Sequence, residues 1–367
     1  MMTTCIEHPK DPVCQQELEH IAACGLDWSA FSHKTVLVTG ATGLVGSYAV
    51  RALAAINRIH HCHMTILAMV RSADKARKIY GPLLERGDVA LLIGDVRDPI
   101  VYDGQVDYII HGASVTASKE MVTRPVETIA TAIGGTEQIL KFAVAKEVTS
   151  MVYISSMEMY GTPDPNLSCV TESNYGRVDV LQVRSCYPEG KRMCECLCAA
   201  YAHEYHLPVK IARLAQTFGA GVSTSEGRVF AQFARSLMNG EDIVLHTEGK
   251  SYGNYCATCD CVRGLLTILL RGVSGEAYNV ANEKTNIRIR DMAQMIADQS
   301  GGKIQVRFDI PEDALQYGYA PDVKMRLSGD KLRGLGWEPE LDLPQMYQQL
   351  MASWQAQEAA ADKGENV

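Results

Sequence analysis

A tyrosine and a lysine four residues apart are the side chains in this sequence best suited to proton transfer. Tyr187 and Lys191 fall at the start of a predicted helix, so both side chains lie on one face of it. An ammonium group beside a phenol stabilises the phenolate and brings a group with an ordinary pKa of about 10 into range for proton transfer. Ser156, at the end of a predicted strand, could hydrogen-bond the same substrate oxygen. The spacing therefore predicts a site that removes a proton from a substrate hydroxyl group.

A glycine-rich turn near the start of the chain predicts a dinucleotide site. Its glycines have the spacing GxxGxxG: the first allows a tight turn, the second lets backbone approach a pyrophosphate, and the third lets the following helix pack closely. The helix N-terminus then offers free N–H groups to the anion. The alternative, a tight turn without a ligand, is disfavoured because the motif follows a strand and opens a helix. We expect the cofactor to be bound here by Gly40, Thr42, Gly43, Leu44, Val45 and Gly46. A bound nicotinamide would take the hydride when the hydroxyl proton leaves.

The next two strands bear on the choice of cofactor. An acidic residue after the second strand would read the ribose hydroxyls of NAD, but Arg71 stands there. An arginine could meet the 2′-phosphate of NADP, and a solvated loop cation is the equally plausible alternative. Asp95 and Val96 follow the third strand, where Asp95 could accept a hydrogen bond from the adenine amino group.

Short apolar strands alternate with helical segments over the first two thirds of the chain. Strands are predicted at 34–39, 64–70, 89–93, 106–111, 151–155 and 209–214, with helices at 44–56, 125–145 and 188–205. This alternation predicts an α/β fold with a doubly wound parallel sheet of the Rossmann type. Shorter elements follow, with helices at 228–238, 260–271 and 291–298, and they predict a smaller C-terminal substrate lobe. We therefore divide the chain into a helical extension (1–33), a Rossmann domain (34–217), a lobe that binds substrate and returns some elements to that domain (218–354), and a frayed tail (355–367).

Composition excludes several classes of protein. The chain has 367 residues and a net charge of −8 without a long basic run, which argues against binding to nucleic acid or an anionic membrane. No stretch approaches the ~18 apolar residues of a membrane span. Charged residues occupy the place of a signal peptide's apolar segment, so we expect a cytoplasmic protein whose twelve cysteines are mostly free thiols. No metal is expected, because Cys194, Cys196 and Cys198 would fan around a helix and Cys256, Cys259 and Cys261 lack a second pair of ligands. The loop with His60, His61, Cys62 and His63 suits a solvated polar turn better than a metal site.

From about Thr35 to Pro339 the chain resembles the extended short-chain dehydrogenases/reductases, the NAD-dependent epimerases and dehydratases that act on nucleotide sugars. The matching motifs are the glycine turn, His111-Gly112-Ala113, the segment 155–161 and the Tyr187/Lys191 pair, and the segment 184–192 looks most like UDP-glucuronate decarboxylases. The resemblance implies a tightly bound NAD, a homodimer and a nucleotide-sugar substrate. It also implies roles: Tyr187 as base, Lys191 as its support, Ser156 as an assistant and Glu158 in later steps. His111, Gly112 and Ala113 would contact the cofactor. Residues expected to contact the substrate are Ser114, Ser156, Arg213, Gln216 and Arg228. For Arg213 and Arg228, an ordinary surface ion pair is the alternative.

Four positions depart from the family's pattern. Ala132 replaces an asparagine, Met157 replaces the aspartate of dehydratases, Arg71 replaces the acidic residue after the second strand, and Gly253 replaces an arginine. What survives is the shared first step, oxidation of a sugar carbinol to a transient ketone, with 4-epimerisation as the simplest outcome. Decarboxylation or dehydration, an NADPH-linked reduction, and cofactor binding without turnover stay open as alternatives.

Overall fold

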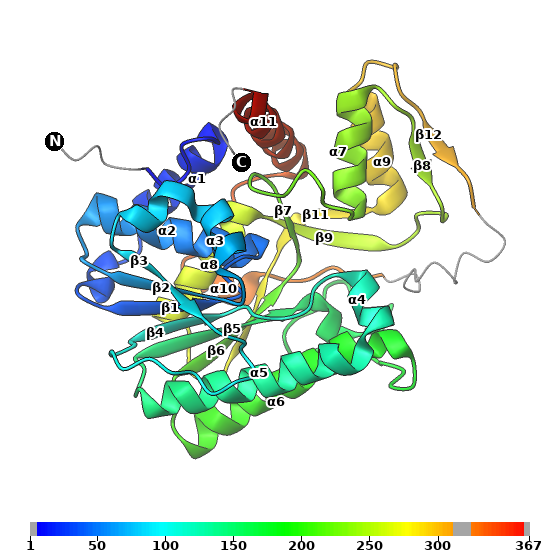
Figure 1. Cartoon of the computed structure of the whole chain (residues 1–367). Helices are drawn as coiled ribbons and strands as arrows, with labels where there is room; N and C mark the ends of the chain where they lie inside the picture. Colours follow the sequence, from blue (N-terminus) through cyan, green and yellow to red (C-terminus); the bar gives the residue numbers. More distant parts are fainter. Residues whose placement is uncertain (1–5, 311–323, 363–367) are drawn as a thin grey trace.

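A computed structural model of the chain describes residues 6–310 and 324–362. Its centre is a seven-stranded sheet in the order β10-β6-β5-β4-β1-β2-β3, and every neighbouring pair is parallel (Figure 1). The strands are β1 (Thr35–Thr39), β2 (Thr65–Val70), β3 (Val89–Ile93), β4 (Tyr108–His111), β5 (Ser150–Ser156), β6 (Val209–Leu214) and β10 (Ala277–Val280). The predicted doubly wound Rossmann sheet is confirmed, and the six predicted strands lie within two residues of their expected bounds.

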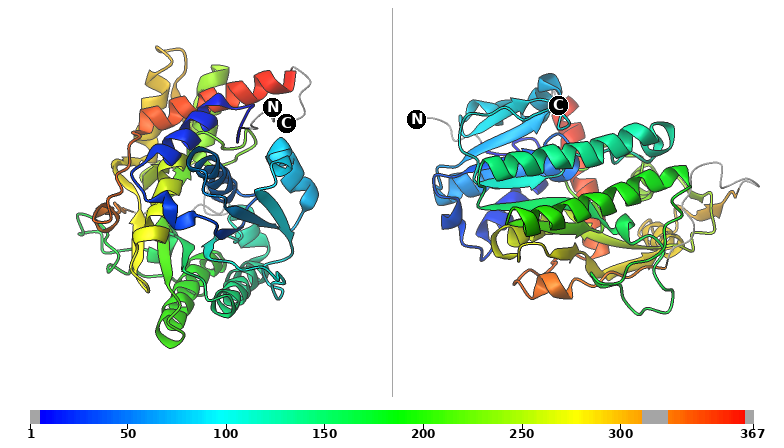
Figure 2. Two further views of the ribbon diagram at one scale, coloured as in Figure 1. Left: turned by 90° about the vertical axis from the view of Figure 1, so that its left-hand side faces the viewer. Right: turned by 90° about the horizontal axis from the view of Figure 1, so that it is seen from below.

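Helices cover both faces of the sheet, which explains why its strands are almost entirely apolar. On one face, α5 (Pro125–Ala145) and α6 (Cys186–Glu204) run side by side (Figure 2). On the other face lie α2 (Leu44–His60) and α8 (Thr258–Arg271), which pack against each other. Shorter elements join these layers: η1 (Trp28–Phe31), α3 (Ala73–Tyr80), η2 (Gly81–Glu85), α4 (Ser118–Thr123), η3 (Met157–Tyr160), η4 (Val183–Ser185) and α10 (Asp330–Arg333).

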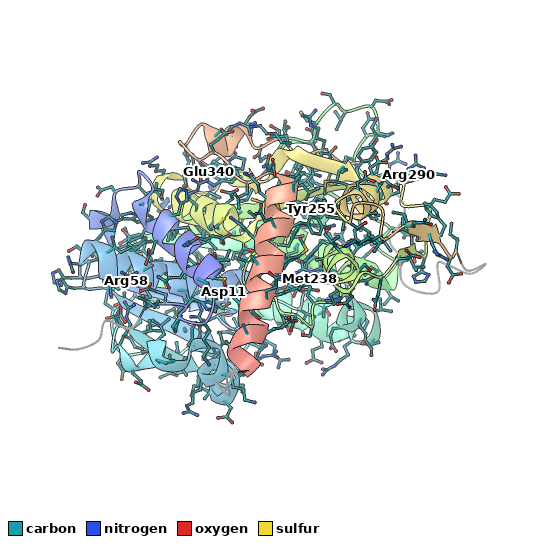
Figure 3. The ribbon with its side chains drawn as sticks, turned by 90° about the horizontal axis from the view of Figure 1, so that it is seen from above. Asp11, Arg58, Met238, Tyr255, Arg290 and Glu340 are labelled. Atoms are coloured by element: carbon teal, nitrogen blue, oxygen red, sulfur yellow. The ribbon has the colours of Figure 1, made fainter. Side chains whose placement is uncertain are left out.

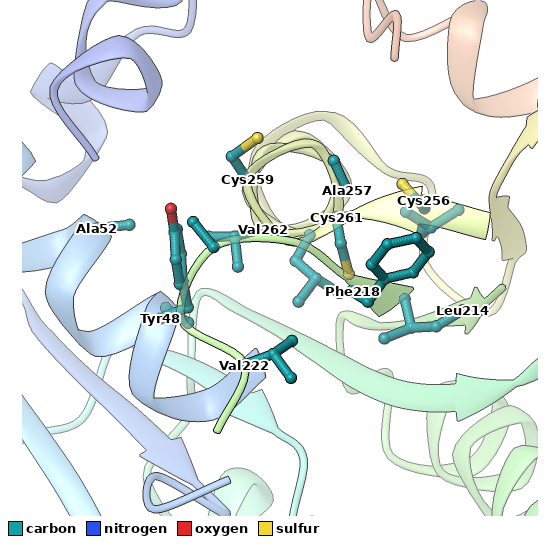
Figure 4. Packing of buried hydrophobic residues seen from close by; sticks show 14 of the residues in the cluster. Tyr48, Ala52, Leu214, Phe218, Val222, Cys256, Ala257, Cys259, Cys261 and Val262 are labelled. Carbon is teal, nitrogen blue, oxygen red and sulfur yellow. The ribbon is translucent and has the colours of Figure 1, made fainter. Parts of the chain in front are cut away.

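A smaller lobe stands at the carboxyl ends of the main strands. It contains a three-stranded sheet in the order β11-β9-β7, a two-stranded sheet of β12 and β8, and two helices. Their bounds are β7 (Gln216–Phe218), α7 (Val229–Asn239), β8 (Ile243–Leu245), β9 (Tyr252–Ala257), β11 (Asn282–Arg288), α9 (Ile289–Asp298) and β12 (Val306–Phe308). Phe218 stacks on Phe230 with ring centroids 4.4 Å apart and meets Tyr255 and Tyr347 edge-on. This aromatic cluster continues into the core around Tyr48 and Cys259 (Figure 4).

The helices nearest the two ends of the chain, α1 and α11, pack against each other. Asp11 caps α1 (Pro12–Ala23) and also accepts a hydrogen bond from Ser353 of α11 (Leu343–Asp362) (Figure 3). The expected frayed tail is wrong as far as residue 362, because α11 runs through it: Gln357 reaches Asp11 at 3.4 Å and Ala360 is buried. Residues 363–367 of that predicted tail lie outside the described residues. Within the described parts of the chain, every helix is too short or too polar to cross a membrane.

Candidate active site

The carboxyl ends of β1 and β4 are tied together by a buried histidine. His111, opposite Thr39 in the sheet register, shares a hydrogen bond of 2.7 Å with the Thr39 hydroxyl and a second of 3.2 Å with Thr136. Burial, with a contribution from the charge of Lys191, lowers the pKa of His111 to about 3, so its imidazole is neutral. The backbone N–H groups of Gly112 and Ala113 donate to the same Thr39 hydroxyl. These three residues therefore fix the loop after β4 against the glycine turn.

At two positions of the glycine turn, Gly40 and Gly46, there is no room for a side chain. Gly40 has a φ of +67°, and a Cβ added to it would lie 2.7 Å from the backbone of Gly112. A Cβ on Gly46 would lie 2.3 Å from the carbonyl oxygen of Gly40. Gly43 is the N-cap of α2, and no side chain caps that helix. The turn thus presents uncapped N–H groups and close, bare backbone, which fits the pyrophosphate of a dinucleotide. Thr42, Leu44 and Val45 are half-buried in the same turn.

The residues expected at the adenosine end lie near one another. Arg71 is exposed directly after β2, and Val96 is buried against Gly135 of α5. Asp95 accepts two hydrogen bonds of 2.9 Å from the Arg97 guanidinium, which with the nearby charge of Arg71 lowers the pKa of Asp95. Asp95 is therefore already engaged by a neighbouring arginine.

Tyr187 and Lys191 lie on the inner face of α6, as their spacing predicts. The phenol of Tyr187 is buried and lies near Ser156 at the carboxyl end of β5, close enough for the serine to lower the pKa of the phenol. The Lys191 ammonium donates to the Ile154 carbonyl at 2.8 Å and lies over the ring of Tyr153. Ser156, Tyr187 and Lys191 thus converge between β5 and α6.

Burial changes the pKa values of Tyr187 and Lys191. It raises the pKa of Tyr187 to about 12, aided by the Glu158 carboxylate, while Ser156, Arg184 and Arg228 act in the opposite direction. Burial also lowers the pKa of Lys191 to about 8. The phenol is therefore protonated at neutral pH in this state, and deprotonation requires additional positive charge beside it.

Glu158 is held by an arginine that the sequence analysis gave no role. Nη2 of Arg184 donates to the two carboxylate oxygens at 3.1 and 2.8 Å, and the guanidinium carbon lies 5.6 Å from the centroid of the Tyr187 ring. The available signal was position: Arg184 precedes Tyr187 by three residues, about one helical turn, and so shares its face.

The residues expected to contact substrate have different environments. Ser114 and Gln216 are half-buried after β4 and at the start of β7, and Arg228 is exposed and paired with Glu226 at 2.8 Å. Arg213 is a correction. Its side chain is 2% exposed and donates to Glu195 at 2.7 Å and to the Tyr160 hydroxyl at 2.9 Å, so it is neither a surface ion pair nor open to a substrate.

Two of the departures from the family's pattern, Ala132 and Gly253, are explained by the residues that pack around them. Ala132 of α5 is buried where that helix meets α6. A Cβ added to Gly190 of α6 would lie 3.5 Å from the Cβ of Ala132, so the two small residues let the helices approach each other closely. A Cβ on Gly253 would lie 2.7 Å from the hydroxyl of Tyr255, which already fills the space of a side chain there. Met157 is half-buried against the core.

Every described cysteine is a free thiol. One group of possible metal ligands occurs among the described residues: His8, Asp11 and Cys14 place their donor atoms within 4.8 Å of one another. Asp11 already accepts from the Cys14 thiol and from Ser353, and Arg51 is close enough to lower the pKa of His8 after burial, so the local charge does not favour a cation.

Residues 36–281 match the NAD dependent epimerase/dehydratase family. The chain belongs to this family. The expected class, an NAD-dependent enzyme of the epimerase/dehydratase type, is thereby confirmed. Among curated relatives, UDP-glucuronic acid decarboxylase 6 of Arabidopsis thaliana is 29% identical over 316 residues, which are 85% of this chain and 86% of that protein. UDP-glucuronic acid decarboxylase 1 of Danio rerio is 28% identical over 84% of this chain and 70% of that protein.

Solved structures of this epimerase/dehydratase family share the fold. The epimerase Mth375 of Methanothermobacter thermautotrophicus superposes with a TM-score of 0.75 at 21% identity, covering 92% of this chain and 96% of that one. DesIV of Streptomyces venezuelae, a dTDP-glucose 4,6-dehydratase solved with NAD bound, gives a TM-score of 0.71 at 22% identity and covers 90% and 98% of the two chains.

Proposed function

We propose that this protein oxidises a carbinol of a nucleotide sugar to a transient ketone, with Tyr187 as the general base and a tightly bound NAD(P) as the redox partner. The observation that carries the proposal is the buried phenol of Tyr187, which lies near Ser156 at the carboxyl end of β5 with the Lys191 ammonium 5.7 Å from its ring centroid. Lys191 links this group to the cofactor turn, because its charge is felt by His111, which fixes the loop beside Gly40.

The residues divide the first step as follows. Gly40, Gly43 and Gly46 hold the pyrophosphate with backbone N–H groups and the N-terminus of α2. When bound, the nicotinamide supplies the hydride acceptor and a positive charge. Ser156 orients the substrate hydroxyl toward Tyr187, and the phenolate removes its proton as the carbon-bound hydrogen leaves with its electron pair. Lys191 stabilises the phenolate, so the pKa of about 12 set by burial falls toward the working range.

The simplest completion is 4-epimerisation, in which Tyr187 returns the proton after the hydride is delivered to the opposite face of the ketone. This outcome needs no further acid, and Met157 could not supply one. A second candidate is decarboxylation of UDP-glucuronic acid, which the names of the curated relatives favour. Glu158 would then act in the later steps, although Gly253 offers no cation for a substrate carboxylate.

The remaining assignments are finer proposals. The family description favours NAD, whereas exposed Arg71 at the end of β2 favours NADP. We propose a cytoplasmic homodimer, by resemblance to the family. Comparing the dissociation constants of NAD and NADP for wild type and Arg71→Ala decides the cofactor, since loss of a phosphate contact weakens NADP alone.

Incubation with UDP-glucuronic acid, UDP-glucose and dTDP-glucose, followed by mass spectrometry and NMR of the sugar, tests the function. Inversion at C4 without a mass change supports epimerisation, and loss of carbon dioxide from UDP-glucuronic acid supports decarboxylation. Net consumption of NADPH would instead favour a reductase. Tyr187→Phe should lower turnover by about 10²- to 10⁴-fold while cofactor binding persists. Full turnover in that variant would refute the proposal.

A further inference from the structure

Arg184 is attached to the catalytic helix by its position in the chain. It lies in η4 (Val183–Ser185), which leads directly into α6, so any shift of Arg184 is coupled to Tyr187. Its guanidinium lies next to both acidic side chains of the site, the Glu158 carboxylate and the Tyr187 phenol. One nitrogen holds both oxygens of Glu158, and the guanidinium carbon lies 5.6 Å from the centre of the phenol ring. Arg184 therefore sits between a carboxylate and a phenol that must itself become an anion.

Two anions this close oppose each other. An ionised Glu158 makes it harder for Tyr187 to lose its proton, and the Arg184 charge counteracts that effect. Burial raises the pKa of the neighbouring Cys186 thiol, the Arg184 charge acts to lower it, and the Glu158 charge acts to raise it. A site that needs both a carboxylate and a phenolate requires a fixed cation between them.

Arg184 is also not placed where it best stabilises the fold. Its Nη1 atom is buried and has no hydrogen-bond partner among the described residues. A buried donor without a partner is unfavourable, so the conformation is retained for the contacts of Nη2 and of the ring face, not for saturation of the guanidinium.

We propose that Arg184 is a positioning residue that clamps Glu158 beside the site and offsets its charge, so that Glu158 and Tyr187 can both be ionised during the reaction. This rests on the proposed function of Tyr187 as base. It assigns to Arg184 no contact with the reacting atoms: the residue acts through the two hydrogen bonds that its Nη2 donates to Glu158 and through its charge at the phenol.

The test follows the ionisation of one phenol, without turnover. The protein as purified is labelled with ¹³C at the tyrosine Cζ, the signal of residue 187 is identified by its loss in Tyr187→Phe, and spectra are recorded from pH 8 to 12, with far-UV circular dichroism at each pH to show that the protein stays folded. Arg184→Gln should move the onset of ionisation upward by about half to one pH unit, since one charge at this distance in a partly solvated site is worth about 1 kcal/mol. Glu158→Gln should move it downward, and the double variant should return close to wild type.

Arg184→Lys separates charge from geometry. It keeps the positive charge but loses the planar guanidinium that lies over the Tyr187 ring, so the phenol should titrate near its wild-type position while turnover of UDP-glucuronic acid, used as the probe, falls. Coincident titrations of wild type and Arg184→Gln, or shifts of Arg184→Gln and Glu158→Gln in the same direction, would overturn the proposal. Absence of turnover in wild type would refute the proposed function but leave the titration, and with it the role of Arg184 at Tyr187, to be decided by the spectra.

Discussion

The ammonium group of Lys191 lies 5.7 Å from the centroid of the Tyr187 ring, in the interior of the protein. Burial lowers the pKa of this lysine to about 8, which is still high enough for its ammonium group to be charged at neutral pH. Its bond to the Ile154 carbonyl fixes it in that place. The lysine thus supplies a positioned cation that faces the phenol without an acidic partner bonded to it.

Replacing Lys191 by methionine should lower kcat by about 100-fold and move the rising limb of the pH–rate profile to higher pH, because the phenolate loses a buried cation that faces it. The steady-state pH profile with the active nucleotide sugar measures both effects. Lys210→Met is a matched control: burial also lowers the pKa of Lys210 to about 8, but its ammonium bonds Ser150 at 2.6 Å at the opposite end of the strands. If both variants changed the profile alike, the effect would reflect general damage and not the phenol.

Gly46 is the glycine at which a side chain would do most harm to cofactor binding. A Cβ at this position would lie 2.3 Å from the Gly40 carbonyl oxygen, within backbone that cannot move without opening the turn. Gly46→Ala should therefore abolish measurable NAD(P) binding and destabilise the fold by about 1–3 kcal/mol. Calorimetric titration and thermal unfolding measure the two effects.

The matched control for this prediction is Gly134→Ala in α5. A Cβ there meets nothing within 4 Å, and alanine favours a helix interior, so stability should stay level or rise slightly. Cofactor binding by Gly46→Ala at wild-type strength would contradict the assignment of this turn.

The parts of the site that the sequence predicts are those set by local spacing. The glycine turn and the Tyr187/Lys191 pair each lie within one turn or one helix, so their geometry follows from short-range rules. Six of the seven strands of the main sheet were also predicted, because continuous apolar runs have few alternatives, whereas β10 (Ala277–Val280) was not.

The errors involve contacts between residues distant in the chain. Arg213 pairs with Glu195 from another element, 18 residues before it in the chain. The last turns of α11 are helical because Gln357 meets Asp11 at the other end of the chain. Periodicity does not contain such partners, so they become visible only in the fold.

A substitution of Arg213 should change the stability of the protein, whereas its sequence position had predicted an effect on substrate binding. Its bonds to Glu195 are buried, and removing the arginine leaves an uncompensated carboxylate that still accepts a hydrogen bond from Ser155. Arg213→Met should therefore destabilise the protein by about 3–5 kcal/mol. Urea denaturation measures this loss, and the double variant with Glu195→Gln should recover much of it. An increase in the KM for the nucleotide sugar without a loss of stability would instead restore the substrate-contact interpretation.

Glu17 gives a prediction with a defined pH window. Its carboxyl is buried against the Tyr48 hydroxyl, and burial, aided by the charges of Asp11 and Asp260, raises its pKa to about 7 from an ordinary value of 4.5. The folded state therefore binds more protons at this group than the unfolded chain between pH 4.5 and 7. Stability contributed by this group falls as the pH rises through that window and is level above it.

Glu17→Gln should remove this penalty while its amide oxygen still accepts from Tyr48. The variant should be more stable than wild type by about 1–3 kcal/mol at pH 8, and the difference should vanish near pH 4.5. Urea denaturation at both pH values measures it, and because His8, whose lowered pKa acts in the opposite sense, is present in both proteins, its effect cancels. Glu19→Gln on the same helix is the control: that side chain is 48% exposed and pairs with Arg58, so its loss should gain nothing at pH 8. Equal gains from both substitutions would show that net charge, and not the buried carboxyl beside Tyr48, sets the stability.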